Sequence, residues 1–218
     1  MSAPLGSIRA IVFDLDGTLV DSLDDITGHL NSALVEAGFP ARSRDEVRGW
    51  VGHGAGQLVA CAVDQADRVP DVLARFRTHY RAAPYGRTHV YAGLELVLDA
   101  LVGRGHVLGV LSNKPHELVV QIADRLLARW PFVAVAGERE GRPRKPDPNS
   151  VLALVDELGV PPSRCAFVGD SEIDVATARA AGMPAVAVTW GLRDAAVLVA
   201  AGADFLVSTP AALGELFG

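Results

Sequence analysis

The stretch Ile8-Arg9-Ala10-Ile11-Val12-Phe13-Asp14-Leu15-Asp16-Gly17-Thr18-Leu19-Val20-Asp21-Ser22 decides the fold. A short apolar run without polar alternation predicts a strand buried on both faces, as in a parallel sheet covered by helices. Asp14 and Asp16 follow where that strand ends, and ligands of open α/β sheets bind at the carboxyl ends of strands. The i, i+2 spacing keeps both acids near one point, and Gly17 permits a sharp turn behind them.

These two acids alone also fit a simple turn, because Asp and Gly are common turn residues. A calcium loop fits less well, since an EF-hand needs acids at positions 1, 3 and 5 and glycine at position 6. Charged residues at the ends of later strands decide between these interpretations.

Composition and charge argue against a membrane protein and against a nucleic-acid-binding protein. The chain has 218 residues, 50% of them hydrophobic, and no apolar run approaches the ~20 residues of a membrane span. Residues 1–7 lack the basic and apolar regions of a signal peptide and predict a loose terminus. A net charge of −6 without a basic tract argues against nucleic acid as a partner. Cys61 and Cys165 form neither a disulfide framework nor a zinc pattern, and Cys165 is predicted to be a small buried residue. A reduced cytoplasm is therefore the expected location. We also expect a monomer or a homodimer.

Residues 22–89 predict a helical insert. Residues 22–25 fit a capping box before a stripe of Ile26, Leu30 and Leu34 at four-residue spacing. Further helices are expected over 43–50, 54–63 and 70–83, with no strand between them. We therefore predict a cap domain at 22–89 and a core domain formed by 1–21 and 90–218.

A glycine-containing loop, Val51-Gly52-His53-Gly54, lies inside this insert. Its glycine spacing does not match the G-x-G-x-x-G of a dinucleotide loop, and no strand precedes it. We predict a flexible loop that contacts the substrate if the insert covers the two acids, and we assign no role to His53.

From residue 91 the chain alternates between strands and helices. Pro115 suits the first position of a helix that continues with Leu118, Ile122 and Leu126, and Asp147-Pro148 suits the start of the next. We expect strands over 106–111, 132–136, 164–168, 185–188 and 204–207, and helices over 93–102, 147–159 and 210–217. A further helix is expected to follow the segment 169–174 and to run through residue 181. This alternation predicts an α/β fold with a doubly wound, Rossmann-like parallel sheet.

Polar side chains follow four of the predicted strands, at Asp14 and Asp16, at Ser112 and Asn113, at Lys145, and at Asp170 with Asp174. Each cluster alone could be a helix cap or a solvated charge. Together they lie at one edge of the predicted sheet. Clustered carboxylates require a cation, and oxygens from Asp14, Asp170 and a carbonyl near Asp16 suit Mg²⁺. A lysine and a hydroxyl beside such a site favour phosphoryl transfer, in which a carboxylate can act as nucleophile through an aspartyl-phosphate.

These segments resemble a known family. Asp14-Leu15-Asp16-Gly17-Thr18, Ser112-Asn113, Lys145-Pro146-Asp147-Pro148 and Gly169-Asp170-Ser171-Glu172-Ile173-Asp174 are similar, in order and spacing, to the four motifs of the haloacid dehalogenase-like superfamily. The helical insert resembles the cap of the subgroup that contains phosphoglycolate phosphatases. The loop at 51–54 and the segment 169–171 also resemble that subgroup.

The resemblance implies a role for each of these residues. It implies that Asp14 attacks phosphorus, and that Asp16 protonates the leaving alkoxide and later deprotonates water. It implies that Ser112 and Lys145 hold the phosphoryl oxygens, that Lys145 also acts in catalysis by offsetting the charge on Asp14, and that Asn113 helps to bind the substrate. It also implies that Mg²⁺ is held by Asp14, Asp170 and the main-chain carbonyl of Asp16. Asp174 is expected to support the metal through water or to orient Lys145.

The resemblance implies a phosphatase for a small phosphorylated metabolite, with 2-phosphoglycolate as the first candidate. Sugar phosphates, nucleotides and pyrophosphate remain alternatives. A phosphomutase is also possible on this fold, although such enzymes tend to carry Glu-Asp where this chain has Gly169-Asp170. A dehalogenase would not need Asp16, and a receiver-type phosphoacceptor domain would lack the inserted cap.

Overall fold

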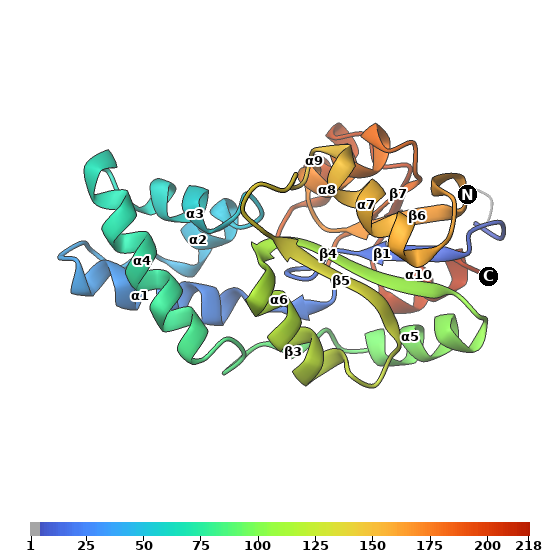
Figure 1. The fold of residues 1–218 in the computed structure, drawn as a ribbon, viewed down its shortest axis with the longest axis horizontal. Coiled ribbons are helices and arrows are strands. Elements are labelled where there is room, and N and C mark those ends of the chain that lie inside the picture. The colour runs from blue at the N-terminus through green and yellow to red at the C-terminus, as the bar shows by residue number, and fades with distance from the viewer. Residues whose placement is uncertain (1–4) are drawn as a thin grey trace.

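A computed structural model describes residues 5–218 and contains a six-stranded parallel sheet between two layers of helices (Figure 1). The strand order is β5-β4-β1-β6-β7-β8, and each neighbouring pair is parallel. The strands are β1 (Ala10–Phe13), β4 (Val107–Pro115), β5 (Phe132–Glu138), β6 (Cys165–Gly169), β7 (Ala185–Val188) and β8 (Phe205–Val207). Because the order extends in both directions from β1, the predicted doubly wound sheet is confirmed.

Both faces of β1 are buried, as its unbroken apolar sequence predicts. Successive side chains of a strand point to opposite faces. Ile11 and Phe13 pack with α5 (Leu94–Gly103), α6 (His116–Ile122) and α10 (Pro210–Leu216). Ala10 and Val12 pack with α7 (Pro148–Leu158), α8 (Glu172–Ala180) and α9 (Ala195–Ala200). Figure 1 shows α7, α8 and α9 on one side of the sheet and α5 and α6 on the other.

Four helices, which we call the cap helices, follow the first strand and its turn. They are α1 (Leu23–Glu36), α2 (Arg44–Trp50), α3 (Ala55–Ala62) and α4 (Val69–Ala82), and they stand at one end of the sheet (Figure 1). A short antiparallel ribbon of β2 (Val20–Asp21) and β3 (His89–Val90) joins them to the sheet. These cap helices pack around an apolar cluster of their own, to which the core adds Leu118.

Two local predictions were wrong. Pro115 is the last residue of β4 rather than the first of a helix, and α6 begins at His116. The strand continues past residue 111 because its polar residues Ser112, Asn113 and Lys114 are buried beneath the cap. The capping box at residues 22–25 is also absent, because Ser22 Oγ donates to Asp16 Oδ1 (2.5 Å) and no side chain caps α1.

The first described residue of the chain is hydrogen-bonded to the C-terminal helix α10. Residues 1–4 of the expected loose terminus lie outside the described residues, whereas the N–H of Leu5 donates to the carbonyl of Leu216 (2.9 Å). Both cysteines are free, with Cys61 exposed and Cys165 buried as predicted. Within residues 5–218, no helix has the length and apolar character needed to span a bilayer.

Candidate active site

The turn after β1 places its two acids side by side at the edge of the sheet. The N–H of Leu15 donates to Asp14 Oδ1 (2.7 Å), and the N–H of Gly17 donates to the carbonyl of Val20 (2.9 Å). Both Asp14 and Asp16 are buried, with 7% and 8% exposure. The tight turn therefore removes two carboxylates from bulk water, which requires nearby compensating charge.

Three buried carboxylates, Asp14, Asp170 and Asp174, form what we call the acid cluster. One oxygen of each lies within 4.8 Å of the others. Burial, and then repulsion by Asp174, raises the pKa of Asp170 to about 7. Burial also raises the pKa of Asp14 well above its usual value, although the charge of Lys145 opposes this. Closely grouped oxygen ligands with excess negative charge suit a hard divalent cation, so the acid cluster can hold a metal ion.

Close packing fixes Asp170 in this cluster. The hydroxyl of Thr18 donates to Oδ1 (3.0 Å), and the N–H of Leu192 donates to Oδ2 (2.7 Å). A Cβ at Gly17 would lie 2.3 Å from Asp170 Oδ2, and one at Gly191 would lie 2.4 Å from Asp170 Cβ. Gly17 also has a φ of 87°, so the turn requires glycine for both its backbone angle and its close approach to Asp170.

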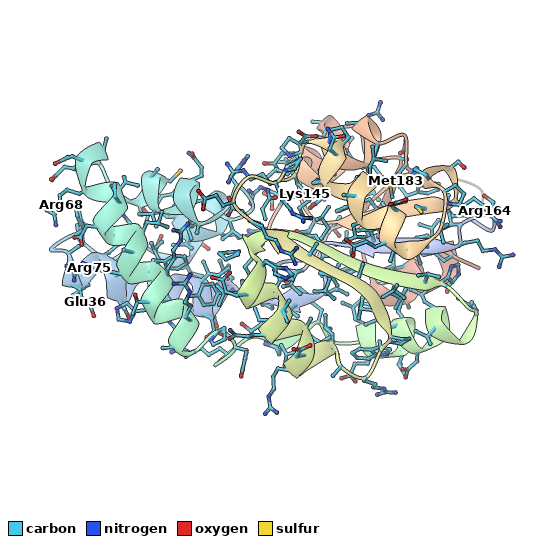
Figure 2. All side chains as sticks on the ribbon, in the orientation of Figure 1. Glu36, Arg68, Arg75, Lys145, Arg164 and Met183 are labelled. Carbon is cyan, nitrogen blue, oxygen red and sulfur yellow. The ribbon has the colours of Figure 1, made fainter. Side chains whose placement is uncertain are left out.

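Lys145 joins the third strand end to this cluster. Its Nζ lies 2.9 Å from Asp14 Oδ1 and 2.6 Å from Asp174 Oδ1. The second oxygen of Asp174 accepts from the N–H (3.0 Å) and hydroxyl (2.6 Å) of Ser171, which caps α8. Asp174 is thus fixed by a helix start and directly contacts Lys145. Figure 2 shows Lys145 at the middle of the molecule, where the loop after β5 faces the cap helices.

Ser112 and Asn113 lie on the buried end of β4 and line the same cavity. The N–H of Lys114 donates to Ser112 Oγ (3.2 Å). The amide of Asn113 donates to the carbonyls of Gly52 (3.0 Å) and Lys145 (2.9 Å), and its buried Oδ1 has no partner within residues 5–218. Asn113 therefore links a cap loop to the loop that carries Lys145.

Lys114 is a site residue that the sequence reasoning missed. Its Nζ lies 2.7 Å from Asp16 Oδ1 and contacts the hydroxyl of Tyr80 from α4. Burial disfavours the ammonium, but Asp16 and Tyr80 outweigh it and raise the pKa of Lys114 above its usual value. A signal was present in the sequence: Lys114 and Lys145 are its only two lysines, whereas its other basic residues are arginines.

The cavity lies between the cap helices and the carboxyl edge of the sheet and is partly open to solvent. The charged residues that line the cavity all belong to the core: Asp14, Asp16, Lys114 and Lys145. Apart from Tyr80 and two glycines, its cap lining is apolar, formed by Ile26, Val51, Ala55, Leu58 and Phe76. The predicted cap loop reaches this cavity through Gly52 and Gly54, while His53 Nε2 lies 3.7 Å from Glu172 Oε1 outside it.

Arg193, a second residue that the sequence reasoning missed, bridges the core and the cap. Its guanidinium donates to the carbonyls of Arg48 (2.9 Å) and Val51 (2.7 Å) and to Glu172 Oε2 (3.0 Å). Arg193 follows Leu192, whose N–H holds Asp170. One loop of the core therefore contacts both the acid cluster and the cap. No sequence pattern indicated this role, because the contacts join segments far apart in the chain.

Comparison with known proteins agrees with this arrangement. A family model described as haloacid dehalogenase-like hydrolase matches residues 11–188. The phosphoglycolate phosphatase of Rhodospirillum rubrum is 40% identical over an aligned length of 220, and the alignment covers 96% of this chain and 91% of that protein. That of Xanthomonas campestris pv. campestris is 37% identical over 191 residues, 85% of each chain. The crystal structure of a predicted phosphoglycolate phosphatase from Haemophilus somnus has a TM-score of 0.90 at 29% identity, covering 97% of this chain and 99% of that one.

Proposed function

The chain belongs to the haloacid dehalogenase-like hydrolase family and is a phosphoric monoester hydrolase, and we propose that it hydrolyses 2-phosphoglycolate with Mg²⁺. The relatives from R. rubrum and X. campestris are both phosphoglycolate phosphatases. The cavity supports a small substrate, because its cap lining offers almost no polar groups to bind the hydroxyls of a sugar or the edges of a base.

We assign the nucleophilic role to Asp14. Its carboxylate attacks phosphorus and forms an aspartyl-phosphate, while Lys145 at 2.9 Å offsets the negative charge of the two reacting groups. Ser112 and Lys145 bind the phosphoryl oxygens. The amide N–H groups of Asn113 donate to the carbonyls of Gly52 and Lys145, so we propose that Asn113 positions these two loops at the substrate cavity.

Asp16 takes the role of general acid and base. It protonates the leaving oxygen of the substrate and then deprotonates the water that hydrolyses the aspartyl-phosphate. Ser22 and Lys114 both bind its Oδ1, and its Oδ2 has no partner among the residues that the structure describes. We therefore assign the proton transfers to Oδ2 of Asp16.

The acid cluster fits a divalent cation. The Mg²⁺ would be held by Asp14, Asp170 and the main-chain carbonyl of Asp16. When bound, the ion neutralises negative charge on the phosphoryl group. Asp174 contacts Lys145 and Ser171, so we propose that it positions Lys145 instead of binding the metal directly.

The observation that carries this proposal is the convergence of Lys145 with Asp14 and Asp174 inside a capped cavity. The test is phosphate release by the purified protein with Mg²⁺ from 2-phosphoglycolate, glucose 6-phosphate, AMP, pyrophosphate and p-nitrophenyl phosphate. We expect kcat/KM to be at least ~10-fold higher for 2-phosphoglycolate than for the others and chelation by EDTA to abolish turnover. A higher kcat/KM for another ester would refute the substrate, and activity unchanged by EDTA would refute the metal.

A further inference from the structure

Lys114 has hydrogen-bonding capacity that the protein does not use. An ammonium carries three N–H donors, and two of them face Asp16 Oδ1 and the hydroxyl of Tyr80. The third has no acceptor within the described part of the chain. The Tyr80 hydroxyl accepts from Lys114, so its own O–H remains free to donate. Both side chains line the cavity, so this pair of neighbouring donors is available to a ligand.

The surroundings of this pair favour an anionic group. Among the residues that the structure describes, the only other cation in the cavity lining is Lys145, and it already contacts Asp14 and Asp174. The remaining cap lining is apolar and offers no competing polar contact apart from backbone. An anion that enters this cavity beside Asp16 would therefore meet Lys114 and Tyr80 first, in a place where burial strengthens an ionic hydrogen bond.

The presence of lysine at position 114 also favours binding of a small anion. Apart from Lys114 and Lys145, every residue with a permanent positive charge is an arginine, and most of these arginines lie at the surface. A lysine ammonium is a compact charge, whereas a guanidinium is planar and larger. A compact charge suits a narrow cavity in which one cation contacts a carboxylate, a phenol and a small ligand together.

We propose that Lys114 and Tyr80 bind the carboxylate of the substrate and so select phosphorylated 2-hydroxy acids over uncharged phosphate esters. This inference rests on the proposed function. Asp16 faces the bridging oxygen of the substrate, and in 2-phosphoglycolate one methylene separates that oxygen from the carboxylate. Because Lys114 lies 2.7 Å from Asp16, its charge stands where the carboxylate of so short a substrate ends.

The experiment compares 2-phosphoglycolate with 2-hydroxyethyl phosphate, in which CH₂OH replaces the carboxylate. Lys114→Met lowers kcat/KM for 2-phosphoglycolate at least ~10²-fold more than for 2-hydroxyethyl phosphate. Tyr80→Phe lowers the same ratio by ~3- to 10-fold, because it removes one hydrogen bond. The matched control is Arg81→Met, which removes a positive charge from an exposed ion pair with Glu117 (2.8 Å) and leaves the ratio unchanged.

Equal losses for both substrates in Lys114→Met would overturn the proposal, because Lys114 would then act only through Asp16. The wild-type protein separates the two proposals. If the wild-type protein shows no preference for 2-phosphoglycolate in the phosphate-release panel, the proposed substrate is wrong. If the wild-type protein has this preference and the Lys114→Met variant keeps it, only the carboxylate site is wrong.

A binding measurement gives an answer even if Lys114→Met fails to fold. Since the chain has two lysines, protein labelled at lysine Cε gives two side-chain signals by NMR. In the Asp14→Asn variant, which lacks the nucleophile, we expect 2-phosphoglycolate to shift both signals and 2-hydroxyethyl phosphate to shift one. A single shifted signal with 2-phosphoglycolate would contradict the carboxylate site.

Discussion

Asp16 lines the cavity, and one of its two carboxylate oxygens, Oδ1, has partners among the described residues. Ser22 and Lys114 bind Oδ1 at 2.5 Å and 2.7 Å. Ser22 lies directly after β2 and Lys114 lies on β4, so the carboxylate is fixed by two segments that are distant in sequence. Such fixation places a proton-transferring atom in advance, which is what general acid–base catalysis requires.

The substitution Asp16→Asn tests this role. The carboxamide keeps an oxygen for Ser22 and Lys114 but cannot exchange a proton, so we expect turnover of p-nitrophenyl phosphate to fall at least ~10²-fold. Mg²⁺ affinity, measured by calorimetry, should stay close to that of the wild type, because the proposed metal site uses only the main-chain carbonyl of Asp16. Asp124→Asn, on the exposed surface of the turn Ala123–Leu127, is the matched control and should keep full turnover. Full activity of Asp16→Asn would refute the assignment.

The sequence predicted which side chains reach one edge of the sheet, but not how they pair. Asp14, Asp170 and Lys145 each follow an apolar strand, and parallel strands bring such positions together. The partners of Asp16 could not be predicted in the same way. Lys114 seemed to lie beyond its strand, and the sequence pattern around Ser22 resembled a helix cap. Lys114 reaches Asp16 only through the pairing of β4 with β1, and Ser22 reaches it across the β2 turn instead of capping the helix that follows.

At the scale of the elements, strand ends were predicted less well than strand positions. The sequence placed the end of the second core strand at residue 111, and β4 continues to Pro115. Polar residues normally indicate the end of a buried strand, but Ser112, Asn113 and Lys114 are buried here by the cap. The helix α9 was not predicted because its six residues, Ala195–Ala200, are uniformly apolar or alanine and show no helical periodicity.

Asp25 connects the start of α1 to the segment that returns from the cap. Its carboxylate accepts hydrogen bonds from the N–H groups of Arg87 and Thr88 and from the Thr88 hydroxyl (2.6 Å). Burial acts to raise the pKa of Asp25, but these hydrogen bonds outweigh it and lower the pKa below its usual value. Because the folded pKa is lower than the unfolded one, ionised Asp25 stabilises the folded state above the unfolded pKa of about 3.9.

We therefore expect the stabilisation by Asp25 to be pH-dependent. Asp25→Asn should lower the free energy of unfolding by about 1–3 kcal/mol at pH 7, because an amide cannot accept from all three donors. This difference from the wild type should shrink as the pH falls below about 4 and Asp25 itself becomes protonated. Urea unfolding of both proteins between pH 7 and pH 3 measures it, with Asp124→Asn as a control that shows no such trend. A difference that stays constant with pH would contradict this account.

At the scale of the whole molecule, the cap shares little apolar packing with the core, although ion pairs such as Arg81–Glu117 and Arg48–Asp194 cross between them. The ribbon pairs Val20 with Val90 and Asp21 with His89, so the chain enters and leaves the cap at neighbouring points. The cap has its own apolar cluster, which includes only Leu118 among buried core residues. Beyond these contacts, Arg193 and Asn113 bind cap carbonyls next to the cavity. The cap can therefore be removed with little loss of core packing, while the cavity loses one entire wall.

Deletion of residues 23–88, closed by a short glycine-containing linker, tests whether this wall sets specificity. We expect the shortened protein to keep a cooperative urea transition, because the sheet and the helices on its two faces remain. Its ratio of kcat/KM for 2-phosphoglycolate to that for p-nitrophenyl phosphate should fall at least ~10-fold. The core still carries Asp14, Asp16 and Lys145, so hydrolysis of the bulkier ester has the groups it needs, whereas the small substrate loses Tyr80 and the exclusion of water. If the ratio were unchanged in a folded deletion variant, the core alone would select the substrate, and the cap would serve only to shield the reaction.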